Sequence, residues 1–498
     1  MKTFQRNRAG RVPWLALLAA LVALLIPALA APAQAADGQP YSNPVKSRAG
    51  ADPWLTYYND SYYLITTSIT NELFMRKSPT LAGLSTAPNV LIWHDDTAGR
   101  NANIWAPEIH FLDGRWYLYY AAGDSSSCCD GQRTNVLESS GTDPMGPYTW
   151  KSQLAGSNLD KGGWLIDTDV LEYGGNRYLL GSAFVGGVQS LVIAPLSNPY
   201  TLASTAFTVI STPTYSWEKV GTAVNEGPEV LSHDGRTFVT YSASHCGTPD
   251  YKLGQLELTG TDPLAPASWT KKSTPVFTRN DTAGVYGPGH NGFFTSPDGT
   301  ENWIVYHANS TTTGGCGNTR STRAQKFTWN ADGTPNFGTP VALGTSLPGP
   351  SGETAATPTA YELVNRRSGK CLDEFAGDPA DGADVIQYTC KGTTNQLWTF
   401  SDPGDETNRV TNVATGKTLD VTNCGTADGA NIRQWSWLDN KCQRWQLVYT
   451  LTGYVRLVNV NSGKVADVAN CNTADGTDVR QWTWLNNDCQ LWQLKPVS

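Results

Sequence analysis

The stretch DGRWYLYYAA at residues 113–122 recurs in altered form along the first two thirds of the chain. Each copy begins with a tight turn of Gly, Asp or Asn and continues as an alternating run of aromatic and aliphatic residues. The starting positions differ by 54, 61, 60 and 64 residues, and the copies are NDSYYLITTS (59–68), DGRWYLYYAA (113–122), GGNRYLLGSA (174–183), DGRTFVTYSA (234–243) and DGTENWIVYHA (298–308). Strand signals repeated at about 50–60 residues are typical of propeller blades, so five copies predict a five-bladed β-propeller.

An acidic residue or a histidine stands shortly before each copy, at Asp52, Glu108, Asp167, Glu226 and His290. The first strand of every blade lines the central axis of a propeller, so equivalent positions in successive blades converge. The repeat therefore predicts one axial pocket that contains carboxylates and an imidazole.

The first 35 residues have a basic start, an apolar run (WLALLAALVALLIPALA) and the ending Ala33-Gln34-Ala35. This pattern predicts a cleaved signal peptide at 1–35 and a secreted, extracellular protein. The run is short and interrupted by proline, which argues against a membrane anchor. Removing its four basic residues changes the formal net charge from −8 to −12. Such a surface disfavours nucleic acid and acidic uronate polymers as partners, but not neutral sugars.

Ten cysteines in a secreted chain indicate disulfides. Six of them, near the C-terminus, are separated by 19, 18 and 18 residues within successive pairs, which predicts local pairing: Cys371 with Cys390, Cys424 with Cys442, and Cys471 with Cys489. The other four leave alternatives open. Cys128 and Cys129 could pair with each other or with Cys246 and Cys316.

A second repeat follows a Pro-, Ser- and Gly-rich stretch, SLPGPSGETAATPT, which reads as a linker. Its Q-x-W triplets lie at 396–398, 443–445 and 490–492, spaced 47 residues apart. Three units of this size predict a β-trefoil whose Q-x-W tryptophans fill a shared core. We therefore expect an all-β chain and a monomer, with a propeller at 36–345, a linker at 346–358 and a trefoil at 359–498.

The Q-x-W units resemble the ricin-type lectin family, also called carbohydrate-binding module family 13. In that family each repeat can form a shallow sugar site from an Asp, a Gln, an aromatic residue and an Asn. The resemblance implies sugar-binding residues at Asp373, Tyr388, Asn395, Asp420, Trp435, Asp467 and Trp482. The chain departs from the pattern at the Gln position, which holds Ile386, Arg433 and Arg480, and at the Asn position of the last two repeats, which holds Cys442 and Cys489.

The propeller region resembles glycoside hydrolase family 43. One phrase per predicted blade carries the resemblance: ADPWL (51–55), WAPEIH (105–110), LIDTDV (165–170), NEGPEVL (225–231) and GPGHNGF (287–293). It implies an inverting hydrolase of arabinose- or xylose-containing polysaccharide, with Asp52 as general base, Glu226 as general acid and Asp167 tuning the acid.

The chemistry of glycoside hydrolysis asks for similar residues. Its oxocarbenium-like transition state needs one proton donor and one carboxylate for the attacking water, about 6.5–9.5 Å apart for inversion. A third carboxylate beside the acid would raise its pKa by like-charge repulsion. The assignment of the three roles comes from the family, and Asp169, on the strand face of Asp167, is an alternative to it.

Further residues are expected around the sugar. Trp54 and Phe74 are candidate aromatic walls, and Trp105 and Glu108 would shape the pocket. Arg320 and Arg323 follow the fifth copy, and we select Arg323 as a residue that reaches substrate hydroxyls. His290 is a candidate ligand of a structural calcium ion or of ordered water, and no cofactor is expected to be required.

The sequence thus predicts a secreted, exo-acting α-L-arabinofuranosidase that a lectin-type module holds on plant cell-wall arabinan or arabinoxylan. Endo-1,5-α-L-arabinanase and β-xylosidase stay open, because exo or endo action depends on loops at the ends of the cleft. A non-catalytic carbohydrate-binding protein is the alternative of a different class, and three acids on one axis argue against it.

Overall fold

The computed structural model describes residues 38–124, 129–354, 360–450 and 453–497. The predicted signal peptide lies outside these residues, and residues 36–498 form one compact unit. Within the described ranges, no helix is long and apolar enough to span a membrane. Helical structure is limited to short turns such as α1 (Asp160–Gly163).

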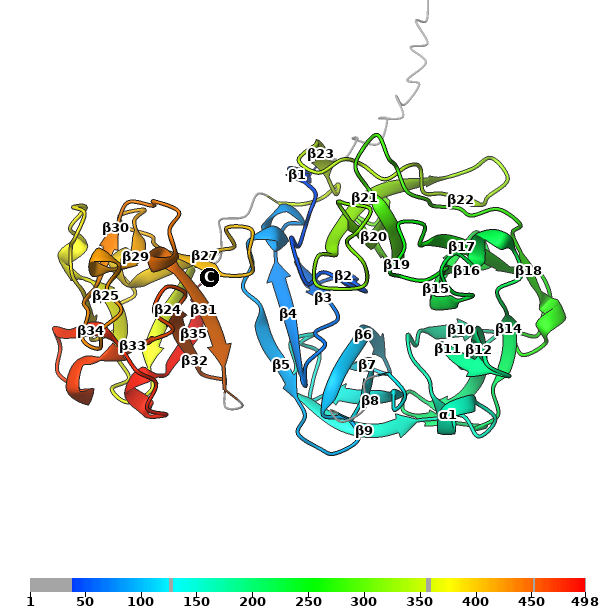
Figure 1. Cartoon of the computed structure of the whole chain (residues 1–498), viewed down its shortest axis with the longest axis horizontal. Helices are drawn as coiled ribbons and strands as arrows, with labels where there is room; N and C mark the ends of the chain where they lie inside the picture. The colour runs from blue at the N-terminus through cyan, green and yellow to red at the C-terminus, as the bar shows by residue number, and fades with distance from the viewer. Residues whose placement is uncertain (1–37, 125–128, 355–359, 451–452, 498) are drawn as a thin grey trace, which may run out of the picture. The chain divides into compact units, whose positions relative to one another are not determined.

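Five antiparallel sheets surround a common axis, which confirms the predicted five-bladed propeller (Figure 1). Each blade runs outward in chain order, and each copy of the repeated phrase supplies the second strand of its blade. The first two blades consist of β2 (Trp54–Tyr58), β3 (Ser61–Ile65), β4 (Glu72–Ser78) and β5 (Val90–His94), and of β6 (Ala102–Leu112), β7 (Arg115–Gly123), β8 (Arg133–Ser139) and β9 (Tyr148–Leu154).

The third blade has five strands, and the last two have four each. The third blade consists of β10 (Val170–Tyr173), β11 (Asn176–Val185), β12 (Val188–Asn198), β13 (Thr201–Leu202) and β14 (Thr208–Ser211). The fourth consists of β15 (Asn225–His233), β16 (Arg236–Ala243), β17 (Lys252–Leu258) and β18 (Trp269–Lys271). The fifth consists of β19 (Tyr286–Thr295), β20 (Asn302–Asn309), β21 (Ser321–Trp329) and β22 (Pro335–Asn336). The innermost strands β2, β6, β10, β15 and β19 therefore face the axis (Figure 1).

The turn that opens each phrase is a hairpin between the first and second strands of a blade. Asp113 and Gly114 both have positive φ, at 51° and 81°, and Gly174 and Gly175 repeat this with 59° and 78°. Two successive left-handed residues form the turn whose twist matches that of the flanking strands, and Asn, Asp and Gly tolerate it best. This requirement explains why the repeat is recognisable in the sequence.

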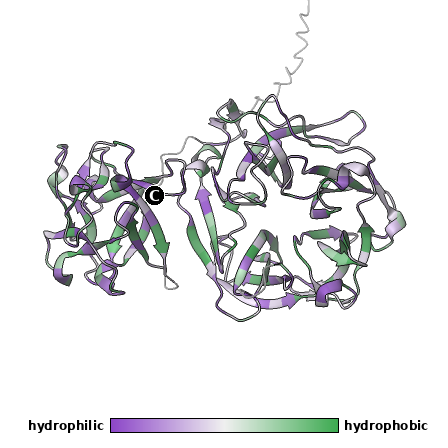
Figure 2. Cartoon of the chain, in the orientation of Figure 1, coloured by the Kyte–Doolittle hydropathy of each residue, from purple (hydrophilic) through white to green (hydrophobic). Residues whose placement is uncertain are grey.

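Apolar side chains from neighbouring blades pack between the sheets. One such cluster joins blades two and three through Tyr119, Val136, Leu179 and Val192. Another closes the ring, because Leu55 and Leu64 of the first blade pack with Trp303 of the last. Hydrophobic residues accordingly follow the strands in Figure 2.

Part of the predicted linker is strand. β23 (Ser346–Gly349) pairs antiparallel with β1 (Gly38–Ser42), and the Glu353 carboxylate accepts hydrogen bonds from the backbone N–H groups of Leu81 and Gln39. The Leu347 side chain packs on the cluster that closes the ring. Composition suggested a linker because Pro and Gly are frequent there, yet an edge strand tolerates both residues.

Twelve strands form the C-terminal domain, a β-trefoil as predicted. Trp398, Trp445 and Trp492 are fully buried in its core, and each indole N–H donates to a backbone carbonyl of the preceding strand pair. The strands are β24 (Ala360–Asn365), β25 (Cys371–Glu374), β26 (Val385–Tyr388), β27 (Leu397–Ser401), β28 (Asn408–Asn412), β29 (Thr418–Val421), β30 (Ile432–Trp435), β31 (Arg444–Tyr449), β32 (Val455–Asn459), β33 (Val465–Val468), β34 (Thr477–Trp482) and β35 (Trp492–Val497).

The three local disulfides predicted for the trefoil are present. In the propeller, Cys246 pairs with Cys316, which removes the alternative that joins either residue to Cys128 or Cys129. Cys128 lies outside the described residues.

Candidate active site

A left-handed residue lies just before the inner strand of each blade or in the first half of that strand. These residues are Asp52, Ala106, Asp167, Gly227 and His290, with φ between 43° and 54°. Register shifts follow at this point in β6, β15 and β19. Such bulges redirect side chains and cluster at functional sites.

These bulges refine the equivalence expected from the sequence. Asp52, Asp167 and His290 do occupy the same place in their blades, but Glu226 lies one residue before it and Glu108 two residues after it. At Gly227 a Cβ atom would lie 3.2 Å from the His290 ring, so only glycine fits beside that imidazole. The acidic groups therefore lie at two levels along the axis. We call Asp52, Asp167 and Glu226 the first tier, and Glu108, Asp169 and Glu229, with His110, the second tier.

Asp52 belongs to the first tier and sits among cationic and hydrogen-bonding partners. Its Oδ1 lies 3.0 Å from Arg320 Nη1 and 3.3 Å from the Nδ1 atoms of His290 and His307, and its Oδ2 accepts from Thr67 Oγ1 at 2.6 Å. Burial opposes ionisation, but Arg320 and the two histidines outweigh it and hold the pKa of Asp52 well below its usual range. Asp52 is therefore a carboxylate throughout the neutral range.

Glu226 has the opposite electrostatic setting. Its carboxyl group accepts hydrogen bonds from Gln189 Nε2 and from the Tyr251 hydroxyl, both at 2.8 Å, and no cation is paired with it among the described residues. Burial, followed by repulsion from the Asp167 carboxylate, raises the pKa of Glu226 to about 7. Glu226 can therefore hold a proton near neutral pH.

Asp167 lies close to both groups. Its Oδ2 accepts a hydrogen bond from the backbone N–H of Gly227 at 3.1 Å, which places it next to Glu226. Burial, followed by repulsion from Asp52, raises the pKa of Asp167 to about 8. Asp167 and Glu226 thus lose their protons as an interacting pair. Together the three residues provide one ionised carboxylate opposite a protonated acid.

The pH dependence of turnover should reflect Glu226. Because this group must carry a proton to act as an acid, kcat/KM is expected to fall as the pH rises through about 7. Asp167→Asn removes the ionisable partner of this pair, so Glu226 should lose its proton more readily and the alkaline limb should move to lower pH. Initial rates between pH 4 and 9 check both points. An unchanged or higher alkaline pKa in the variant would contradict this interpretation.

The second tier contains Glu108, His110, Asp169 and Glu229. His110 Nε2 lies 3.2 Å from Glu108 Oε2 and 3.6 Å from Asp169 Oδ1. Asp169 also accepts from the backbone N–H groups of Val170 and Val230. Burial raises the pKa of Asp169 to about 7 and lowers that of His110 to about 3. Ligand atoms of Glu108, His110 and Asp169 lie within 4.8 Å of one another, so this set could hold a cation.

The structure places several other predicted residues. Trp54 packs against His110, with ring centroids 4.8 Å apart, and Trp105 is partly buried beside Trp164. Two predictions were wrong. Phe74 lies on β4, the third strand outward, and its ring faces Tyr449, so it cannot form a wall of the axial pocket. The second is Arg323, which was expected to reach substrate hydroxyls. Its guanidinium is buried and donates to Ser321 and Ser310, and Arg320 is the arginine that contacts Asp52.

Sequence reasoning missed four partners of the central acids: Thr67, Gln189, Tyr251 and His307. Tyr251 lies in the sequence PDYKLG (249–254), and His307 is the last but one residue of the fifth copy of the repeat, yet neither position is distinguished in the sequence from residues that only pack. These contacts appear only in the folded ring, where Thr67 and His307 meet Asp52, and Gln189 and Tyr251 meet Glu226.

The predicted lectin residues lie at equivalent positions of the three trefoil repeats. In the first repeat, the Asp373 carboxylate accepts from Asn395 Nδ2 at 3.2 Å and from Gln396 Nε2 at 2.7 Å, and Tyr388 lies on the neighbouring strand. In the other two, Asp420 and Asp467 accept from an arginine that also covers the aromatic ring.

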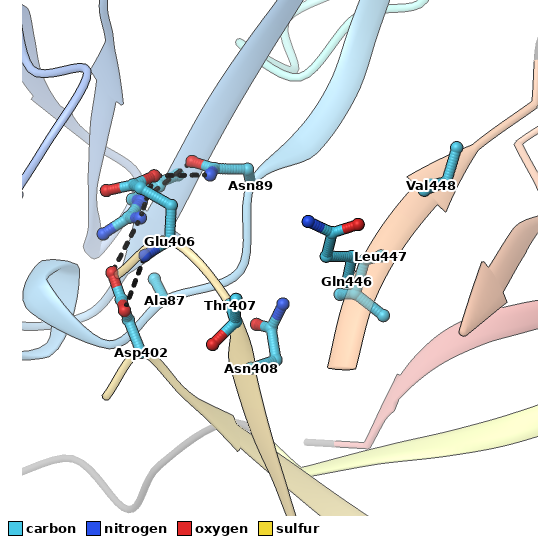
Figure 3. Close-up of a pocket in the computed structure, with 10 residues that line it drawn as sticks. Ala87, Asn89, Asp402, Glu406, Thr407, Asn408, Gln446, Leu447 and Val448 are labelled. Atoms are coloured by element: carbon cyan, nitrogen blue, oxygen red, sulfur yellow. Dashed lines mark hydrogen bonds and ion pairs between the residues drawn. The ribbon is translucent and has the colours of Figure 1, made fainter. Parts of the chain in front are cut away.

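Another pocket, formed by Ala87, Asn89 and residues 402–408 and 446–448, has a different character (Figure 3). There the buried Arg76 guanidinium donates to Asn89 Oδ1 at 2.8 Å and to Glu406 Oε2 at 3.1 Å, and it lies 3.6 Å from Asp402. These charges are mutually paired. Asp402 and Glu406 are therefore both held by one guanidinium.

A five-bladed ring with an ionised carboxylate and a protonated acid on its axis defines the site of a glycoside hydrolase that acts by acid–base catalysis. Residues 41–335 match the model of the glycosyl hydrolases family 43, and the chain belongs to this family. Residues 350–435 and 441–498 match the ricin-type beta-trefoil lectin domain-like family.

Curated relatives agree with this assignment. The chain is 42% identical over 342 residues, 66% of its length and 70% of the relative's, to an extracellular exo-alpha-(1->5)-L-arabinofuranosidase of Streptomyces avermitilis. It is 35% identical over 376 residues, 72% of each chain, to alpha-L-arabinofuranosidase 43 of Humicola insolens. The crystal structure of an alpha-L-arabinofuranosidase from Lactobacillus brevis matches 61% of this chain and 98% of that chain, with 34% identity and a TM-score of 0.57.

Proposed function

We propose that this enzyme is an exo-acting α-L-arabinofuranosidase that releases terminal arabinose with inversion. The observation that carries the proposal is the contrast in surroundings between Asp52, 3.0 Å from the Arg320 guanidinium, and Glu226, which accepts from the neutral Gln189 and Tyr251. The names of the two curated relatives support arabinose as the sugar. Endo-arabinanase and β-xylosidase are the alternatives within the class.

In this mechanism Glu226 donates its proton to the glycosidic oxygen as the bond to the anomeric carbon breaks. Asp52 takes a proton from the water that attacks the opposite face of the ring. Arg320 and the two histidines keep Asp52 ionised, and Asp167 keeps Glu226 protonated until the leaving group needs the proton. Afterwards a proton must return to Glu226 and leave Asp52 before the next turnover.

The test uses linear α-1,5-arabino-oligosaccharides and the 4-nitrophenyl α-L-arabinofuranoside and β-D-xyloside. Chromatography should show monomeric arabinose from the earliest time point, and proton NMR should show the β-anomer appearing first. Initial release of internal fragments would indicate an endo-acting enzyme, and faster cleavage of the xyloside a xylosidase. The α-anomer as first product would overturn inversion, and no release from any substrate would favour a carbohydrate-binding protein.

We further propose that the trefoil holds the enzyme on plant cell-wall polysaccharide outside the cell, as tethering raises the local concentration of substrate. The extracellular relatives support this location. Because β23 and Glu353 belong to the propeller, truncation after Thr354 is the suitable variant. It should keep its turnover of 4-nitrophenyl arabinofuranoside and lose retention on insoluble arabinan in a pull-down. Equal retention of both forms would contradict the tethering role.

We propose that hydrolysis requires no cofactor. A structural calcium ion would be held by Glu108, His110 and Asp169 rather than by His290, because the Nδ1 atom of His290 faces Asp52. Carboxylate oxygens suit calcium, and its role there would be to join two blades, the second through Glu108 and His110 and the third through Asp169.

A further inference from the structure

The second and third trefoil repeats carry an arginine on the face of their aromatic residue. The guanidinium carbon of Arg433 lies 3.9 Å from the ring centroid of Trp435, and that of Arg480 lies 4.2 Å from Trp482. Stacking of a guanidinium on an indole is favourable, most of all where water is partly excluded. In both repeats the indole face on which a sugar ring would stack is therefore already covered.

A buried carboxylate fixes the orientation of each arginine. Arg433 Nε lies 3.0 Å from Asp420 Oδ1, and Arg480 Nε lies 3.4 Å from Asp467 Oδ1. The two aspartates are only 4% and 5% exposed. Because Nε contacts the aspartate, the terminal nitrogens Nη1 and Nη2 are the atoms that a ligand could contact. In the described part of the chain, Nη1 and Nη2 of Arg433 have no hydrogen-bond partner.

We propose that these two pockets bind the carboxylate of an acidic sugar, a uronic acid residue, instead of the ring of a neutral one. The terminal N–H groups of a planar guanidinium match the two oxygens of a carboxylate, and such bidentate pairs are strong and directional. At Arg480 the Nη2 atom also lies 3.3 Å from Asn470 Oδ1, so a ligand there would share that donor with the amide. The indole behind the guanidinium holds it flat, and the aspartate prevents it from rotating.

A glycine lies beside each of the two indole rings. Gly382 borders the second pocket, where a Cβ atom would lie 3.5 Å from the Trp435 ring and 3.9 Å from Arg433 Nη1. Gly429 takes the same place at the third pocket, 3.6 Å from Trp482. These distances are ordinary van der Waals contacts, but both glycines have positive φ, so a larger residue would be strained there.

The first repeat differs and offers an internal control. Ile386 occupies the position of the arginines, and Asp373 is bonded by the amides of Asn395 and Gln396 instead of a guanidinium. The cation nearest the Tyr388 ring is the flexible Lys391 ammonium, at 4.3 Å. This pocket retains the polar set suited to the hydroxyls of a neutral sugar.

The negative net charge of the chain disfavours acidic polymers as partners. That charge has little effect on a ligand in contact with Arg433 or Arg480, because most of it lies at a distance. At physiological ionic strength charges are screened beyond about 8 Å. A carboxylate in contact with Arg433 or Arg480 therefore responds mainly to that guanidinium. Binding should consequently weaken with added salt without being prevented by the remaining surface.

Calorimetric titration of the full-length protein with α-1,4-tetragalacturonate tests the proposal. Its fully methyl-esterified form has the same shape without the charge and is the matched ligand. At pH 7 the acid should bind at two sites, and the ester at least tenfold more weakly. Equal affinity for acid and ester would overturn the proposal, as would the absence of any binding.

Variants locate the site. Arg433→Gln with Arg480→Gln should abolish binding of the acid, and the corresponding double Lys variant should bind more weakly than wild type. Arg456→Gln, which removes a trefoil arginine that stacks on Trp484 instead, should bind like wild type. If the double Gln variant unfolds, the Lys variant and the ester still decide the matter. Unchanged binding by a folded double Gln variant, or equal binding of poly-glutamate, would overturn the assignment to an acidic sugar. Arabinoside turnover does not enter any of these measurements.

Discussion

Glu226→Gln is expected to lower kcat for α-1,5-arabinobiose by about 10²–10⁴-fold, the usual contribution of a positioned general acid. Glutamine keeps the shape of the side chain and can retain contacts with Gln189 and Tyr251, but it has no proton to give to the leaving oxygen. Because a dinitrophenolate leaves without protonation, the 2,4-dinitrophenyl arabinofuranoside should lose far less activity. Steady-state kinetics on both substrates check this.

Glu229→Gln is the matched control for that variant, since Glu229 is a buried acid on the same strand, three residues further along. In the Glu229→Gln variant, the ratio of kcat for α-1,5-arabinobiose to kcat for the 2,4-dinitrophenyl arabinofuranoside should be the same as in wild type. If Glu226→Gln lost activity equally on both substrates, or on neither, Glu226 would not be the proton donor.

The propeller could be predicted because its sequence signal is local. Each hairpin needs two successive left-handed residues, so Asp113-Gly114 and its counterparts stand out before an alternating strand. The trefoil was predictable for a related reason, as the three Q-x-W tryptophans at an interval of 47 residues form one buried core. The edge strand β23 was not, because its pairing with β1 joins residues about three hundred positions apart.

The site was predictable only in part, and strand geometry explains the errors. Side chains alternate between the faces of a strand, so Arg320 and Arg323, three residues apart, cannot both point toward Asp52. The bulges add a second complication, because they shift Glu226 and Glu108 to opposite sides of the residue that is equivalent to Asp52. Counting residues back from the repeated phrase places Asp52, Glu226 and Glu108 at the same height along the axis, whereas in the structure Glu108 belongs to the second tier.

The two tiers also show how one ring of blades supports acids in opposite protonation states. All of these groups are buried, and burial alone raises the pKa of a carboxyl group. The difference lies in the neighbours: Asp52 has Arg320 within 3.0 Å, whereas Glu226 accepts from the neutral Gln189 and Tyr251 and is raised in pKa by Asp167. The placement of one arginine thus separates base from acid.

Asp52→Asn should lower kcat by about 10²–10⁴-fold on good and poor leaving groups alike, because activation of water is needed whichever group departs. The amide oxygen can still accept from Arg320, and the amide NH2 can donate to Thr67 Oγ1, so KM should change much less than kcat. Azide, which attacks without losing a proton, should restore part of the turnover and yield the β-azide. Kinetics with both arabinosides, with and without azide, and NMR of the product test this. A loss confined to the unactivated substrate would instead make Asp52 the proton donor and reverse the two roles.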